Sequence, residues 1–176
     1  LFTRLNPVRF FRKFFSVMFF AFSSSTSNAT IPLNMEKLSE LGVSKDVSSF
    51  TIPLGATINM DGTAIMQGVA VMFAAQAYGI DLGTTALLTV IFTAVMASIG
   101  TAGVPSVGLI TLTMVFNSVG LPVQAIGMIF GIDHILDMFR TAVNVTGDAI
   151  CTLIVSFKNK SLDVDVYNGI KKRDPS

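Results

Sequence analysis

The sequence predicts an all-α membrane protein with two re-entrant helical hairpins, a broken transmembrane helix and a polar transmembrane helix, related as an inverted repeat. Three observations lead to this prediction. Apolar residues make up 51% of the chain and charged residues only 13%, which is unlike a soluble domain of this length. No acidic or basic residue occurs from Leu82 to Ile132, a run long enough for two membrane passages of about 20 residues. Short polar or glycine-rich segments interrupt the apolar stretches near their middles.

Composition also excludes several classes of function. The net charge of +1, without a basic patch, carries no signal for nucleic-acid binding. The single cysteine, Cys151, allows neither an internal disulfide nor a cysteine-based metal cluster. No nucleophile–base pair or metal triad stands out, so we do not expect an enzyme. The chain begins at Leu1 and not at Met, and we expect it to be the C-terminal part of a longer protein.

The first re-entrant hairpin is expected within residues 1–42, after an N-terminal basic segment. Residues 14–35 separate the basic cluster ending at Lys13 from the charged loop beginning at Glu36, and their middle is the small polar run Ser23–Asn28. A single crossing would place that run at the bilayer centre, where unsatisfied polar groups are costly. Two short arms that enter and leave on one side avoid this cost and keep the basic residues together. The single crossing remains the alternative.

A broken transmembrane helix is expected within residues 43–80. Its apolar segment contains Pro53 and Gly55, followed by the polar run Asn59–Thr63. An unwound segment at mid-depth would offer backbone carbonyls and the Asp61 carboxylate, which suit a hard monovalent cation. The alternative is a kinked helix with a hydrated polar patch.

The second re-entrant hairpin is expected within residues 81–120. Its tip, Ser98–Ser106, contains Pro105 and two of three closely spaced glycines, Gly100, Gly103 and Gly108. These residues interrupt a helix, and small residues allow the backbone to approach a ligand closely. The alternative is two short packed helices joined by a glycine-rich turn.

The polar transmembrane helix is expected within residues 121–160, opened by Pro122 and followed by a cytoplasmic tail, 161–176. Spacings of mostly three and four place its polar residues on one stripe. Each ionised side chain costs roughly 2.5–3.5 kcal/mol at bilayer depth, so the stripe must face protein, water, ions or a charged substrate. We expect Asp133, nearest the helix start, to lie in water. The stripe consists of Asp133, Asp137, Arg140, Thr141, Asn144 and Asp148.

The order of hairpin, broken helix, hairpin and polar helix is typical of secondary transporters, whose discontinuous segments meet at the membrane midplane. An ion channel is the main rival, but a channel needs a continuous polar lining. Here the polar residues gather on tips and breaks. An intramembrane hydrolase would need a base near a tip serine, and the only histidine, His134, lies on another segment. Lysine and arginine at both ends predict that both ends are cytoplasmic.

At these residues the chain resembles the sodium-coupled glutamate/aspartate transporter family, the dicarboxylate/amino acid:cation symporters. The resemblance covers about residues 16–157 and is carried by several motifs in order. These are the serine-rich tip before Pro32, the sequence Asn59–Thr63, the sequence Gly100–Pro105, and Asp137–Thr141 with Asn144 and Asp148.

The resemblance implies a substrate site for an acidic amino acid. Arg140 would hold the side-chain carboxylate, because a guanidinium matches a carboxylate. Asp137 would take the ammonium group, and Asn144 and Thr141 would bind the main-chain end. The remaining residues would close the pocket, and they are Thr63, Gly103, Val104, Thr26, Ser27 and Asn28.

The resemblance also implies sites for co-transported sodium ions. One ion would be bound by Gly55, Asn59, Asn144 and Asp148. A second would be bound, largely through backbone oxygens, by Thr57, Met60, Ser98, Ile99 and Thr101. Asn59 and Asp61 would contribute to a third.

The implied protein is a multi-pass transporter of the plasma membrane that moves aspartate or glutamate with sodium by alternating access. A symporter of C4-dicarboxylates or neutral amino acids within the same family is the alternative, ahead of an ion channel. Its partners would be substrate, sodium and the lipid bilayer, and upstream scaffold helices would form a homotrimer.

Overall fold

The computed structural model describes residues 3–99, 101, 103 and 105–172, and every regular element among them is a helix. Val43 and Leu162 form an isolated antiparallel bridge. The predicted all-α class is therefore confirmed for the described part of the chain. In chain order the elements are α1 (Pro7–Ser24), α2 (Ser27–Glu40), α3 (Lys45–Ile58), α4 (Asp61–Ala77), α5 (Thr84–Ser98), α6 (Val107–Ser118), a 3₁₀ turn (Val123–Ala125), α7 (Ile126–Phe130), α8 (Asp133–Lys158) and α9 (Val164–Asn168).

The first pair of helices, α1 and α2, is interrupted within the serine-rich run. Asn6 caps α1 by accepting a hydrogen bond from the Val8 amide at 3.0 Å, and Pro7 occupies the first turn. At the other end Ser25 adopts a left-handed conformation, with φ of 49°, which ends the helix. Since α2 starts after Thr26, the break lies inside the predicted tip.

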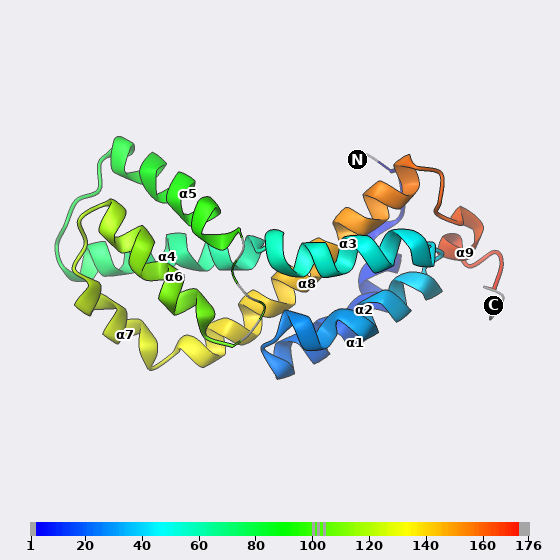
Figure 1. The fold of residues 1–176 in the computed structure, drawn as a ribbon, viewed down its shortest axis with the longest axis horizontal. Coiled ribbons are helices and arrows are strands. Elements are labelled where there is room, and N and C mark those ends of the chain that lie inside the picture. Colours follow the sequence, from blue (N-terminus) through cyan, green and yellow to red (C-terminus); the bar gives the residue numbers. More distant parts are fainter. Residues whose placement is uncertain (1–2, 100, 102, 104, 173–176) are drawn as a thin grey trace.

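The helices α3 and α4 follow one another along the long axis of the molecule (Figure 1). Asn59 and Met60 lie between them outside helical geometry. The broken helix is thus present, but its unwound part is shorter than Asn59–Thr63, because α4 already begins at Asp61. An aspartate in a first turn is favourable there, since it faces unpaired amides.

The second pair, α5 and α6, packs against α4 at one end of the molecule (Figure 1). Helix α5 ends at Ser98 and α6 begins at Val107, so the connection coincides with the predicted glycine-rich tip. Ser106, just before α6, has φ of 60°.

The last long helix starts later than the sequence predicts. A single helix from Pro122 is wrong, because a 3₁₀ turn and the short helix α7 occupy residues 123–130, and α8 begins only at Asp133. Gly127 and Gly131 weaken helix formation across this region. With 26 residues, α8 is long and apolar enough to cross a membrane by itself, and it alone passes this test among the described helices.

Two apolar clusters flank α8. One joins α4 to α5, α6 and α7, and includes Val71, Leu112 and Phe116, all fully buried. The other joins α1, α2 and α3 to the later part of α8, and includes Phe14 and Leu38. Helix α8 packs against each of α1 to α4, so residues on its buried face lie within reach of the first pair and the broken helix.

The C-terminal segment packs on the end of the molecule that holds the start of α1 and the α2–α3 turn. The Tyr167 hydroxyl donates to the Asn6 carbonyl at 2.9 Å, and the Asp163 amide donates to the Gly42 carbonyl at 2.9 Å. Tyr167 is 1% exposed, and burial raises the pKa of its hydroxyl. The hydroxyl therefore remains a donor at neutral pH.

Gly42→Ala should destabilise the protein by more than about 1 kcal/mol, because Gly42 has φ of 91° and a Cβ there would overlap the Asp163 carbonyl oxygen. Thermal unfolding of the purified protein carrying this chain measures the effect. Gly68→Ala is the matched control, because that glycine lies inside α4, has open space around it and has no positive φ. Equal melting temperatures for the two variants would contradict the packing described.

Candidate functional site

Four of the predicted polar residues lie on one buried face of α8. Asp137, Arg140, Thr141 and Asn144 are each 5% exposed or less. Their spacing of three and four residues brings them onto the side that faces the broken helix and the two helix connections. The structure thus gathers the predicted substrate residues of this helix into one cluster.

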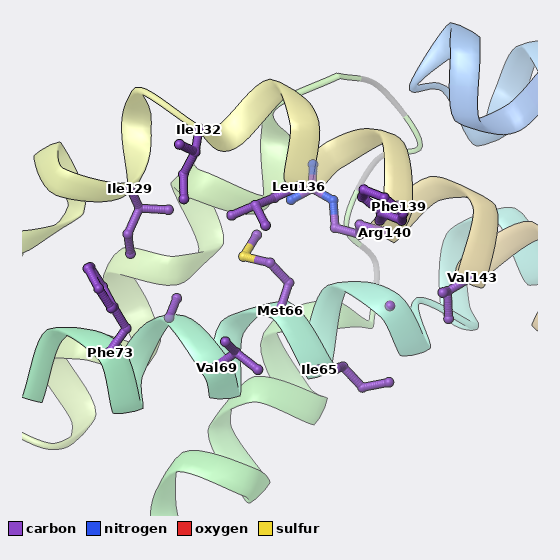
Figure 2. A pocket seen from close by; sticks show the side chains of 12 residues that line it. Ile65, Met66, Val69, Phe73, Ile129, Ile132, Leu136, Phe139, Arg140 and Val143 are labelled. Atoms are coloured by element: carbon purple, nitrogen blue, oxygen red, sulfur yellow. The ribbon is translucent and has the colours of Figure 1, made fainter. Parts of the chain in front are cut away.

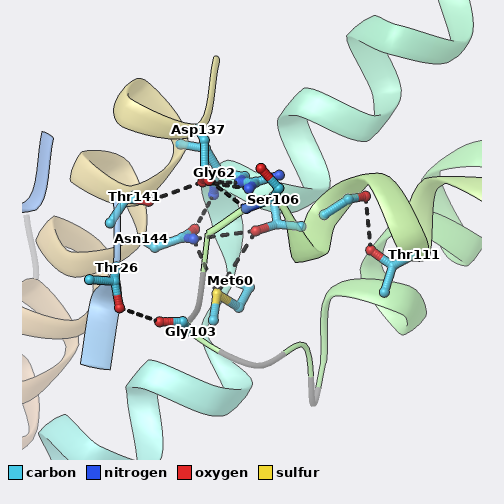
Figure 3. A network of polar contacts seen from close by, with 12 residues as sticks. Thr26, Met60, Gly62, Gly103, Ser106, Thr111, Asp137, Thr141 and Asn144 are labelled. Carbon is cyan, nitrogen blue, oxygen red and sulfur yellow. Dashed lines mark hydrogen bonds and ion pairs between the residues drawn. The ribbon is translucent and has the colours of Figure 1, made fainter. Parts of the chain in front are cut away.

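Asp137 is the most connected group in this cluster (Figure 3). Its Oδ1 pairs with the Arg140 guanidinium through Nη2 and through Nε at 3.1 Å, and accepts from the Thr141 hydroxyl at 3.3 Å. Its Oδ2 accepts from the Ser106 backbone amide at 2.7 Å. The carboxylate therefore joins α8 to the connection between α5 and α6.

These contacts use only part of the hydrogen-bonding capacity of the Arg140 guanidinium. Its Nη1 is buried and has no hydrogen-bond partner among the described residues. Burying an unpaired cationic N–H is costly, so a carboxylate that reached this atom would form a strong charge-assisted contact.

Asn144 connects the same face of α8 to the broken helix (Figure 3). Its Oδ1 accepts from the Gly62 amide at 2.7 Å, one of the amides that the start of α4 leaves unpaired. Its Nδ2 lies 3.1 Å from the Met60 sulfur and 3.3 Å from the Thr63 hydroxyl. The break between α3 and α4 is thereby fixed against α8.

The connections of the two helix pairs meet at Gly103. Its carbonyl accepts hydrogen bonds from the Thr26 hydroxyl at 2.7 Å and from the backbone amide of Asn28 at 3.3 Å. A Cβ on Gly103 would lie 2.9 Å from the Asn28 side-chain oxygen and 3.1 Å from the Ser27 Cβ, so a side chain at residue 103 would crowd the start of α2. The predicted site residue Val104 lies outside the described residues.

A pocket unites residues from all of these elements. The first pair contributes Ser25 and Ser27, the broken helix contributes Met60 and Thr63, and the second pair contributes Thr101, Gly103 and Val107, while α8 contributes Asp137, Arg140, Thr141 and Asn144. The lining combines one cation, one carboxylate, hydroxyls and an amide. Such a set suits a small zwitterionic or anionic molecule, and the cavity of about 10 Å³ would have to widen to admit one.

Several predicted sodium ligands also lie together. The side-chain amide of Asn59 donates a hydrogen bond to Asp148 Oδ1 at 3.0 Å. A Cβ on Gly55 would lie 2.6 Å from the same oxygen. A Cβ on Gly147 would lie 2.9 Å from Asn59 Nδ2 and 3.0 Å from Asp61 Oδ2. The break, the start of α4 and α8 therefore place two carboxylates and an amide close together.

The second predicted ion set is only partly gathered. Met60 and Thr101 line the same pocket. Ser98 and Thr101 are buried, and their hydroxyls donate to the carbonyls of Val95 and Ala97, respectively, at the end of α5. Two further members face outward, since Ile99 is 48% exposed and Thr57, also exposed, donates to the Leu54 carbonyl.

Asp133 corrects one expectation. It is 3% exposed and not in water, and its Oδ1 has no hydrogen-bond partner among the described residues. The reason is that α8 begins at Asp133, so the side chain sits at a helix start packed into the protein.

Ser106 and Gly62 act through their backbone amides and were not predicted as site residues. Side-chain chemistry gives no sign of such contacts. Only their position could have indicated these contacts. Both residues lie at a helix start within a predicted interruption, where backbone amides are left unpaired.

Beside the polar cluster lies an apolar pocket of about 320 Å³ between α4 and the α7–α8 region (Figure 2). Met66, Leu136 and Phe139 belong to its lining, and Arg140 is its charged member. The arginine stem therefore borders apolar surface while its guanidinium joins the polar cluster.

Comparison with known proteins identifies the class. Residues 1–157 match the sodium:dicarboxylate symporter family, and the chain belongs to this family of membrane transporters. Named relatives include an excitatory amino acid transporter of Caenorhabditis elegans, 44% identical over 169 residues, and excitatory amino acid transporters 3 and 2 of Homo sapiens, 44% and 42% identical over 175 and 160 residues.

These matches cover most of this chain but a minor part of each relative. They include 96%, 98% and 90% of the chain, and 33%, 33% and 28% of the respective relatives. The chain thus spans about a third of the length of the curated relatives it matches.

Ser106→Gly should stabilise the protein by up to about 1 kcal/mol, because a left-handed conformation is strained for serine and not for glycine. The exposed Ser106 side chain loses no packing, and the amide contact to Asp137 is kept. Ser49→Gly, at an exposed position inside α3, should instead lower the melting temperature. A fall in both variants would argue against the described connection.

Proposed function

We propose that the protein carrying this chain is a secondary active symporter that moves an acidic amino acid, aspartate or glutamate, together with sodium ions. The observation that carries the proposal is the buried Arg140 guanidinium, held by Asp137 on one side and left with an unpaired Nη1 on the other. The relatives named as excitatory amino acid transporters support the same substrate class.

In this proposal the substrate side-chain carboxylate binds the Arg140 guanidinium. A charge-assisted contact in a desolvated pocket is strong and selective for a carboxylate. The substrate ammonium binds Asp137, whose oxygens are held by the Ser106 amide and by Arg140. Thr141 and Asn144 bind the main-chain carboxylate, and Thr63, Ser27 and the Gly103 backbone close the pocket from its other sides, together with Thr26, Asn28 and Val104.

One sodium ion binds at Asp148, with the Gly55 carbonyl, Asn59 and Asn144. Its support is the convergence of Asn59, Asp148 and Gly55 around one carboxylate oxygen. The oxygen ligands suit a hard cation. A second ion uses Met60, Thr101, Ser98, Thr57 and Ile99, and a third uses Asn59 and Asp61.

Asn144 couples substrate and ion binding. It holds Gly62 and Met60 at the break and also lines the substrate pocket. An ion that orders the break therefore orders the pocket, and the coupling must act equally in both directions.

The architecture proposed for transport places α1–α2 and α5–α6 as re-entrant hairpins of an inverted-repeat transport core. The 15 residues of α5 and 12 of α6 extend about 23 and 18 Å at 1.5 Å per residue, less than a hydrocarbon core of about 30 Å. Opening at a hairpin connection would give alternating access. Both chain ends are cytoplasmic, the membrane is the plasma membrane, and the assembly is a homotrimer.

A C4-dicarboxylate is the alternative substrate within the family. It would place a second carboxylate, and not an ammonium group, near Asp137. Like charges in one desolvated pocket repel, so the Asp137 carboxylate favours an amino acid.

Arg140→Cys should abolish selective binding of acidic substrates, at a loss of several kcal/mol or about 100-fold or more, because the substrate carboxylate would be buried unpaired. Serine and alanine lack this carboxylate and should lose little. The measurement is competition by aspartate, glutamate, serine and malate against radiolabelled uptake in proteoliposomes. If Arg140→Cys keeps the parent preference for aspartate, Arg140 is a structural counter-ion and the proposed substrate class fails.

Asp148→Asn should shift the sodium concentration needed for half-maximal aspartate uptake upward by at least about tenfold, since it removes a charged oxygen ligand. Uptake across a sodium series measures this shift, and choline replaces sodium to give the baseline. Asp81→Asn, in the exposed α4–α5 connection, is the matched control and should leave the curve in place. An unchanged sodium curve for Asp148→Asn would remove this carboxylate from the ion site.

A further inference from the structure

The guanidinium of Arg140 lies directly against Gly108, the second residue of α6. A Cβ built on Gly108 would overlap Arg140 Nη1 and lie 2.7 Å from Cζ and 3.3 Å from the Met66 methyl. Both separations from Arg140 are closer than real Cβ atoms allow. The position of the charge therefore depends on the absence of a side chain at residue 108.

Helix α6 cannot readily retreat from this contact. The Thr111 hydroxyl donates to the Gly108 carbonyl at 3.1 Å and accepts from Gln67 Nε2 at 2.7 Å. Gln67 is fully buried on α4. This chain of hydrogen bonds ties the first turn of α6 to a neighbouring helix.

The arginine is the part that would give way. A guanidinium is the far end of a flexible side chain, whereas the Gly108 backbone is fixed within a helix. Displacing it would disturb the two contacts with Asp137 Oδ1 and move the buried, unpaired Nη1 from its present place against Gly108. The consequence is a misplaced charge in a protein that still folds.

We propose that Gly108 is a positioning residue that determines substrate specificity by setting where the Arg140 guanidinium lies. This inference rests on the proposed function, because it assigns the acidic-substrate preference to Arg140. We further infer that the preference for acidic substrates requires a glycine on α6, a different helix from that of Arg140. A residue with a side chain at this position displaces the guanidinium and favours substrates without a second carboxylate.

The test compares the parent protein with Gly108→Ala, Arg140→Cys and the double variant in proteoliposomes. Gly108→Ala should raise the KM for aspartate by at least about tenfold, as expected when a desolvated charge pair loses its geometry, with a smaller change for serine. In the Arg140→Cys background the added Gly108→Ala should have no further effect, because the colliding group is gone. Gly68→Ala, on α4 with open space around it, is the matched control.

Thermal unfolding of the four purified proteins gives a second readout that needs no transport. Gly108→Ala should lower the melting temperature in the parent and leave it unchanged, or raise it, in the Arg140→Cys background. Equal falls in both backgrounds, or equal losses for aspartate and serine uptake, would overturn the inference. Retained acidic preference in Arg140→Cys would instead contradict the proposed function. Loss of that preference with no effect of Gly108→Ala would overturn the inference alone.

Discussion

Asp137 and Arg140 lie one turn apart on α8, and their opposite charges are buried beside one another. Charges in such surroundings are tolerated only when paired and hydrogen-bonded, and this requirement shapes the elements around them. The α5–α6 connection supplies the Ser106 amide, α8 supplies the Thr141 hydroxyl, and α6 supplies a glycine surface at Gly108. The interruption between α5 and α6 thus contributes a backbone amide that a continuous helix would have used internally.

The need of buried polar groups for hydrogen-bond partners also explains why backbone groups form much of the site. A helix that stops leaves amides and carbonyls without partners, and the described interruptions direct them toward α8 or toward each other. The Gly62 amide binds Asn144, and the Gly103 carbonyl joins the two connections through Thr26 and Asn28. Glycine and serine at these places permit close approach and left-handed turns. The pocket is therefore coupled to the conformation of the connections, which is what the proposed alternating access would require.

Much of this organisation could be predicted from the sequence. Runs such as Ser23–Asn28 and Ser98–Ser106 predicted interruptions that the structure places there, because serine, glycine and proline disfavour a continuous helix locally. The polar face of α8 followed from helical spacing. The later start of that helix, the burial of Asp133 and the roles of Ser106 and Gly108 could not be predicted. Each depends on which element lies opposite in three dimensions, and a backbone amide or an absent side chain leaves no chemical signature.

We propose that the guanidinium of Arg140 receives the side-chain carboxylate of an acidic amino acid. The most direct test is an experimental structure of the protein in saturating sodium and aspartate, at a resolution that orients the ligand. We expect the side-chain carboxylate of aspartate within hydrogen-bonding distance of Arg140 Nη1 and its ammonium group beside Asp137. Aspartate bound elsewhere, or bound here with its side-chain carboxylate away from Arg140, would contradict it.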